Sequence, residues 1–249
     1  MATAKRGRVG DALLITVFGA CLVAAACLIG KQVLTDMAYR NLEGEVAMPV
    51  SVEADAAGGD WDWDGLFAQN PDTVAWLSVE GTPISYPVVQ PGEGKQSDWY
   101  LKHDFWGNRS DEGCPYLDVR SPRDGRHLLV YGHHLGFSDR MFSPIFSCYR
   151  QSEFDKLGSA SWFTPDGGRL SLSPVCSLSV DMSYEPIQTF RFDGEDGLRE
   201  WLRGIAESAT ARAADWENSC AGAERVLTLV TCSSAWSGQR ARTLVVFAA

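Results

Sequence analysis

The sequence predicts a mainly β protein, a closed or partly closed barrel, with one apolar helix before it at the N-terminus. Three observations predict this fold class. Many short β-rich segments alternate with turns, few segments have helical periodicity, and one stretch of 19 residues near the N-terminus has no charge. Beyond that stretch about 220 residues remain, enough for a single core and a single domain.

The uncharged stretch, residues 12–30, has the length of a membrane span, because about 20 helical residues cross a hydrocarbon core. Lys5, Arg6 and Arg8 precede it. The positive-inside rule then predicts a cytoplasmic tail at 1–11, a transmembrane signal-anchor helix at 12–30, and an extracytoplasmic remainder. A cleaved signal peptide and a lipoprotein signal at Cys27 are the alternatives, and both also export the chain. We therefore expect a single-pass protein of the cell membrane.

Charge and cysteine content narrow the class of protein. The 249 residues include 22 Lys and Arg against 32 Asp and Glu, a net charge of −10. Such an acidic chain is not expected to bind nucleic acid, which requires a basic surface. Two of the seven cysteines lie in the apolar stretch, and the other five are an odd number, so at least one exported thiol stays unpaired. Whether Cys114, Cys148, Cys176 and Cys220 form disulfides or are buried as small apolar residues is left open.

The elements follow in chain order. Residues 31–60 are predicted to be a juxtamembrane linker, in which 38–45 extends a helix and 51–60 is Gly/Ala-rich. The domain then covers 61–249. Its predicted helices are 64–69, 141–149 and 195–211, the last with apolar residues at helical spacing. Its predicted strands are 73–79, 84–89, 115–119, 127–131, 169–180, 225–231 and 243–248.

Two of these strands end in residues with reactive side chains. Residues 128–130 lead into Gly132, His133 and His134, and residues 228–231 lead into Cys232. A cysteine nucleophile needs a base near neutral pH, because its unperturbed pKa is about 8.5. Histidine can take the thiol proton and later protonate a leaving amine. An arginine, here Arg240 or Arg242, can stabilise an oxyanion. Together these residue types predict cysteine catalysis.

Each residue also has a plainer interpretation. Cys232 alone is more often a buried structural cysteine, and His133 alone is more often a hydrogen-bonded turn residue. His133, His134 and Asp139 resemble a metal site, but neighbouring histidines on an extended segment point in opposite directions. We therefore expect no metal and no cofactor.

Several segments resemble class B sortases. TLVTC at 228–232 and YGHH at 131–134 look like the active-site signatures of that family. The segments at 70–77, 81–90, 100–105 and 113–118 are similar to its other characteristic blocks, in the same order, and the likeness runs from about residue 64 to 247. It implies a membrane-anchored cysteine transpeptidase with an eight-stranded β-barrel, peripheral helices, and a helix at 195–211 inserted before the last strands.

The resemblance also implies residue roles. Cys232 would be the nucleophile, His133 the general acid/base with His134 as runner-up, and Arg242 the group that holds substrate or oxyanion, with Arg240 as runner-up. Residues near the substrate groove would be Leu101, Tyr100 and Thr231. Many class B members have Ser two residues before the cysteine, where this chain has Val230.

The implied reaction cleaves a C-terminal sorting motif of a surface protein after threonine through a thioacyl-enzyme. The protein then passes to an amine of a peptidoglycan precursor. A pilin-polymerising sortase, which uses a pilin lysine, has the same chemistry. A cysteine peptidase or hydrolase and a noncatalytic anchored binding domain are further alternatives.

Overall fold

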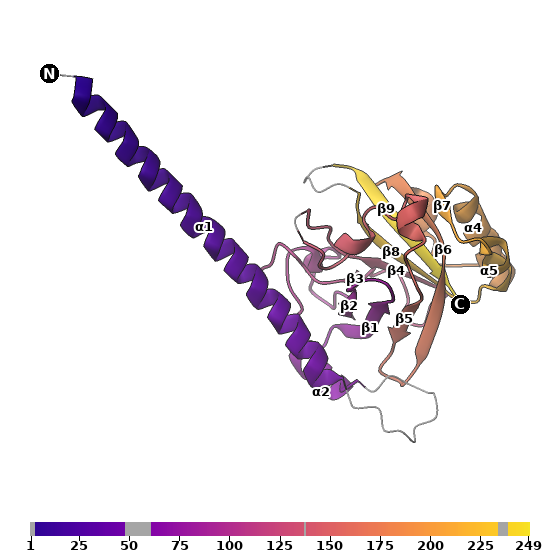
Figure 1. Ribbon diagram of the computed structural model, residues 1–249. Coiled ribbons are helices and arrows are strands. Elements are labelled where there is room, and N and C mark those ends of the chain that lie inside the picture. Colours follow the sequence, from indigo (N-terminus) through magenta and orange to yellow (C-terminus); the bar gives the residue numbers. More distant parts are fainter. Residues whose placement is uncertain (1–2, 48–60, 137, 234–238) are drawn as a thin grey trace. The chain divides into compact units, whose positions relative to one another are not determined.

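The computed structural model describes residues 3–47, 61–136, 138–233 and 239–249 (Figure 1). The chain divides into two units, Met1–Glu45 and Val46–Ala249. The predicted linker segment 51–60 lies outside the described residues.

The first unit contains the helix α1 (Thr3–Val46) except for its last residue, and this helix includes the uncharged stretch. Its large apolar side chains between Leu13 and Ile29 are exposed to the surroundings. Among the described residues, this helix near the N-terminus is long and apolar enough to cross a membrane. The helix also continues without a break through 31–46, beyond the 38–45 extension that the sequence predicts.

The second unit contains a closed barrel, which confirms the predicted fold class. Eight strands form a ring in the order β5-β1-β2-β3-β4-β8-β9-β6, and pairing of β5 with β6 closes it. The short strand β7 adds to the edge of β6. The bounds are β1 (Thr73–Val79), β2 (Ser85–Val89), β3 (Tyr116–Leu117), β4 (His127–Tyr131), β5 (Ala160–Phe163), β6 (Arg169–Asp181), β7 (Ala211–Arg212), β8 (Val226–Cys232) and β9 (Ala241–Ala248).

Short helices surround the barrel. They are α2 (Trp63–Gln69), α3 (Gln151–Phe154), α4 (Gly194–Glu207) and α5 (Trp216–Gly222), with 3₁₀ turns η1 (Trp99–Leu101), η2 (Ser143–Ile145) and η3 (Glu185–Gln188). Two predicted helices are confirmed as α2 and α4. The helix predicted at 141–149 is wrong, since only η2 forms there. Met141 has a φ of 51°, a left-handed conformation that does not start an α-helix.

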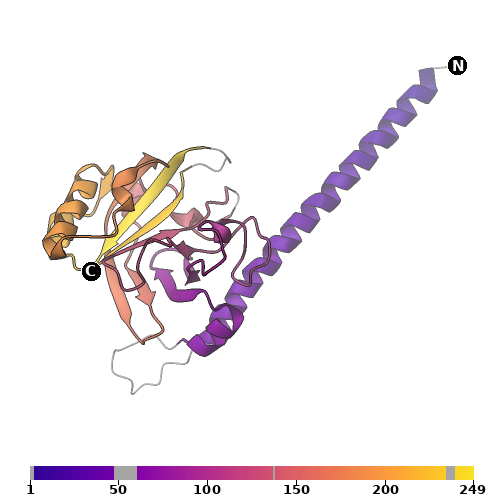
Figure 2. The same ribbon diagram turned by 180° about the vertical axis from the view of Figure 1, so that it is seen from behind.

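Helices α4 and α5 cover one face of the four neighbouring strands β4, β8, β9 and β6, and the candidate site lies on this face. Figure 2 shows α4 and α5 against this side of the barrel. Leu198, Leu202 and Ile205 of α4 are buried against Val230 of β8 and Leu244 of β9, among other core residues. Burial of each such aliphatic side chain contributes about 1.5–3 kcal/mol. Helices α4 and α5 therefore stabilise the part of this face that they cover, and loops surround the edge at which β4 and β8 end.

His127 lies on the same face and gives the fold a predicted pH dependence. The side chain is fully buried, its Nδ1 donates to the Thr189 carbonyl oxygen at 2.8 Å, and its Nε2 accepts from the Thr228 hydroxyl at 2.9 Å. Burial lowers the pKa of His127 to about 4. Between about pH 6.5 and pH 4 the unfolded chain therefore binds a proton that the folded chain does not.

We expect the free energy of unfolding to fall by a few kcal/mol over this interval as the pH is lowered. In His127→Gln, which retains a donor and an acceptor but does not titrate, this part of the dependence should disappear. Urea unfolding at pH 7 and pH 4.5 measures it. Equal pH dependence in the two proteins would contradict the assignment.

Candidate active site

The three side chains that the sequence singles out lie in one row across neighbouring strands. Strands β4 and β8 are parallel with Tyr131 opposite Val230, and the Gly132 N–H continues the ladder by donating to the Val230 carbonyl oxygen at 3.0 Å. His133 and Cys232 each come two residues after that pair. On the other side of β8, Cys232 pairs with Arg242 of antiparallel β9. Residues level with one another across strands face the same way, so the register gathers these three groups.

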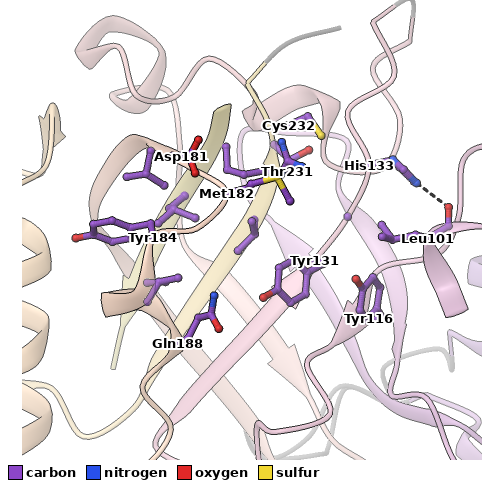
Figure 3. A pocket seen from close by; sticks show the side chains of 16 residues that line it. Leu101, Tyr116, Tyr131, His133, Asp181, Met182, Tyr184, Gln188, Thr231 and Cys232 are labelled. Atoms are coloured by element: carbon purple, nitrogen blue, oxygen red, sulfur yellow. Dashed lines mark hydrogen bonds between the residues drawn. The ribbon is translucent and has the colours of Figure 1, made fainter. Parts of the chain in front are cut away.

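A pocket of about 270 Å³ opens at this row (Figure 3). Its walls come from the loop after β4, the ends of β8 and β9, the end of η1, and the segment between β6 and η3. The lining residues are Leu101, Tyr116, Tyr131, Gly132, His133, Val180, Asp181, Met182, Tyr184, Ile187, Gln188, Val230, Thr231, Cys232, Arg242 and Leu244. Many of these side chains are apolar, so the pocket suits a peptide held beside a few polar groups.

The imidazole of His133 is oriented by a main-chain contact. Its Nε2 lies 2.7 Å from the Leu101 carbonyl oxygen (Figure 3). A carbonyl oxygen only accepts, so Nε2 carries the proton and Nδ1 of the neutral ring keeps the lone pair. Gly113, with a φ of 64°, makes this approach possible, because a Cβ there would meet both the Tyr100 carbonyl oxygen and the His133 ring. The ring therefore presents Nδ1 as its basic atom.

Cys232 differs from the other cysteines of the domain in its exposure. It is partly exposed at the end of β8 and lines the pocket. Cys148 and Cys220 are buried, and burial raises their pKa to about 12 and about 11, respectively. Burial also raises the pKa of Cys176. These three thiols are not disulfide-bonded and are held neutral, whereas Cys232 is accessible from the pocket.

The two arginine candidates are separated by the structure. Arg242 lines the pocket, and its Nη1 donates to the carbonyl oxygens of Gln239 (2.9 Å) and Ala241 (3.0 Å), which holds the guanidinium on the β8–β9 connection. Arg240 instead forms a bidentate ion pair with Asp181, at 2.9 and 2.7 Å. That pair and the bonds from Ser183 hold the pKa of the Asp181 carboxyl well below its usual range. Arg240 is not among the lining residues.

The three groove residues implied by the resemblance lie in different surroundings. Leu101 and Thr231 line the pocket. Tyr100 does not. It is 1% exposed, and its hydroxyl donates to Asp72 at 2.7 Å, so it braces the loop that carries Leu101. Tyr100 therefore lies behind the groove, and its hydroxyl is already hydrogen-bonded to Asp72.

His134 is directed away from the pocket, as expected for the neighbour of His133 on an extended segment. Its ring stacks on Phe146 with centroids 4.1 Å apart. In the part of the chain that the structure describes, no group of three or more His, Cys, Asp or Glu side chains is arranged to hold a metal ion.

Sequence reasoning missed one wall of the pocket. Asp181 is the last residue of β6, and Met182, Tyr184, Ile187 and Gln188 come from the segment that follows it and includes η3. This segment has no periodic pattern. The signal available in the sequence was its mixture of aromatic and apolar residues, Met182 among them, in a turn-rich stretch, because methionine is common at binding surfaces.

Curated proteins of similar sequence include two sortases. No family model matches the chain. Sortase B of Staphylococcus aureus is 26% identical over 186 residues, which cover 74% of this chain and 72% of that protein. Sortase B of Listeria monocytogenes is 23% identical and covers 71% and 69%, respectively.

Solved structures agree with these relatives. Clostridium perfringens sortase B is 25% identical with a TM-score of 0.62, covering 74% of this chain and 97% of that one. A sortase B–substrate complex from S. aureus has a TM-score of 0.71 at 22% identity, over 88% and 97%, and shares the fold. The barrel and the relatives together indicate a cysteine transpeptidase that is similar to sortases. Among sortases, the chain resembles sortase B.

Proposed function

We propose that this sortase-type enzyme cleaves a C-terminal sorting motif after threonine and joins the released protein to an amine of a cell-wall precursor. Cys232 is the nucleophile, His133 the general acid/base, and Arg242 the residue that stabilises the oxyanion or holds the substrate. The observation that carries the proposal is the single row formed by these three residues at the mouth of one pocket.

In the acylation step, the Cys232 sulfur attacks the threonine carbonyl carbon while Nδ1 of His133 takes the thiol proton. The carbonyl oxygen becomes an oxyanion opposite Arg242. When the tetrahedral intermediate collapses, the peptide bond breaks and His133 gives its proton to the departing amine. The product is a thioacyl-enzyme. The Leu101 carbonyl supports this route because it engages Nε2 and leaves Nδ1 as the proton carrier.

An acceptor amine then resolves the thioacyl-enzyme. It attacks the thioester carbonyl, His133 removes its proton, and the Cys232 thiol is regenerated with a new amide as product. A sortase B solved in complex with triglycine, a peptide with a free amine, supports an amine acceptor. The relatives do not favour the pilin-polymerising alternative, which differs only in the acceptor.

Anchoring follows from the N-terminal helix. We propose residues 1–11 as a cytoplasmic tail, 12–30 as the membrane span, 31–60 as the juxtamembrane segment and 61–249 as the extracytoplasmic catalytic domain. The exposed apolar side chains of α1 and the basic residues before them support this arrangement. Placement outside the membrane would bring the pocket to surface proteins and cell-wall precursors.

Full-length protein in detergent, incubated with a panel of sorting-motif peptides with and without triglycine, tests the reaction. We expect a thioacyl adduct on Cys232 by mass spectrometry and an amide product that includes triglycine. Free acid as the product in the presence of the amine would indicate a hydrolase. Absence of any adduct across the panel would reject the sortase reaction.

Arg242→Ala should lower kcat/KM for acylation about 10²–10³-fold, because removal of one oxyanion donor typically costs about 2.7–4 kcal/mol. Arg240→Ala is the matched control, since Arg240 pairs with the lining residue Asp181 but does not itself line the pocket. It should change kcat/KM less than about threefold, as expected for an exposed ion pair. Stopped-flow acylation measures both, and equal losses in the two variants would remove the distinction between the arginines.

A further inference from the structure

We infer that Gln188 reads the donor peptide: its side-chain N–H group donates a hydrogen bond to a carbonyl oxygen of the sorting motif. The inference rests on the proposed function, because it concerns how the donor peptide is held in the same pocket. Gln188 ends η3 and lines the pocket at a distance from the reacting row. Figure 3 shows it beside Tyr131, on the side of the pocket away from Cys232 and His133.

The orientation of the Gln188 amide is fixed by Arg120. Nη1 of Arg120 lies 2.9 Å from Oε1 of Gln188. A guanidinium has donors only, so the amide oxygen must face Arg120 and the NH₂ group must face the other way. Within the described residues, Nε2 of Gln188 has no hydrogen-bond partner, and Figure 3 shows the nitrogen on the pocket side. The Gln188 side chain therefore presents a hydrogen-bond donor to a ligand in the pocket.

Arg120 is itself held firmly, so the donor has a defined position. Its Nε and Nη2 contact the two carboxylate oxygens of Asp118 at 2.9 and 2.7 Å. Asp118 is 6% exposed and also accepts from the Tyr131 hydroxyl at 3.3 Å. The Arg120 guanidinium lies over the Phe190 ring, 5.1 Å from its centroid. This chain of contacts connects the amide to β4, which also leads to His133.

The surroundings indicate what the donor binds. Val180, Ile187, Val230 and Leu244 make the neighbouring pocket lining apolar. Gln188 is itself exposed to solvent, so a ligand that covers this apolar wall displaces water from its N–H group and must supply an acceptor in its place. A neutral peptide supplies carbonyl oxygens, from its main chain or from Asn and Gln side chains. The ligand of Gln188 is thus an amide carbonyl of the sorting motif, at a position away from the threonine bond that is cleaved.

Gln188→Glu separates this role from a structural one. The carboxylate still accepts from Arg120 but has no donor, so a residue that only holds Arg120 would be unaffected or improved. We expect KM for the sorting peptide to rise about tenfold, the fold-change for a lost hydrogen bond of about 1.4 kcal/mol, with kcat within about twofold. The control Glu185→Gln, on the same 3₁₀ turn outside the pocket lining, also changes one charge and should leave KM within about twofold.

Peptides in which each Asn or Gln of the motif is replaced by Leu distinguish the two sources of the carbonyl. If one replacement raises KM in the wild-type protein and has no further effect in Gln188→Glu, the ligand is that side chain. If every replacement adds to the variant's loss, it is a main-chain carbonyl. Acylation of the wild-type protein with an unchanged KM in Gln188→Glu would overturn the inference, whereas no acylation of the wild type would reject the proposed function instead.

Discussion

Replacement of Cys232 by alanine is expected to abolish the thioacyl adduct and to reduce transpeptidation by about 10⁴-fold or more, as for removal of a covalent nucleophile. The sulfur is the atom that bonds to the threonine carbonyl in the proposed reaction, and no neighbouring side chain in the described pocket offers a second thiol. Intact-mass spectrometry after incubation with a sorting peptide reads the adduct, and amide formation with triglycine reads turnover.

Cys220→Ala is the matched control, because it removes a buried thiol of α5 that belongs to the core and lies outside the pocket lining. It should retain the adduct at the same mass, with a small loss of stability from the vacated volume. An adduct that persists in Cys232→Ala and disappears in Cys220→Ala would move the nucleophile to another part of the molecule.

The strands that form the site were predictable from sequence because they are short, apolar and β-rich. The runs at 127–131 and 226–232 were predicted within a residue or two. Strands β5 and β7 were missed, since four and two residues are too few for an alternating pattern to stand out. Their existence depends on pairing with β6, which is a contact between distant segments.

The convergence of His133, Cys232 and Arg242 was not available from composition or spacing. It depends on the register of β4 with β8 and of β8 with β9, and one slipped residue would turn Cys232 to the other face. The resemblance to sortases supplied the three residues without that register. The structure supplies the physical reason that they meet.

Tyr100 and Gln188 both show that the sequence does not reveal which polar side chains are available to a ligand. Tyr100 belongs to a segment that resembles the family, yet its hydroxyl is taken by Asp72, from 28 positions earlier in the chain. Gln188 has no motif around it, yet Arg120, 68 positions away, orients it at the pocket. In both cases a hydrogen bond between distant segments decides which polar group is available to a ligand.

His133→Gln isolates proton transfer from positioning at the reacting row. The glutamine amide can still donate to the Leu101 carbonyl, as Nε2 of the histidine does at 2.7 Å, but it has no titrating atom to take the thiol proton. We expect kcat for acylation to fall about 10²–10⁴-fold, the usual contribution of a general acid/base, with KM for the peptide little changed.

The pH–rate profile of acylation provides the second measurement for this variant. A bell-shaped profile reports an essential acid and an essential base together, so it should lose its bell shape in His133→Gln, which has no imidazole. His134→Gln is the matched control, because that ring stacks on Phe146 outside the pocket and should leave the profile in place. If His134→Gln flattens the profile and His133→Gln keeps it, the base is His134, and the hydrogen bond to Leu101 serves the loop rather than the reaction.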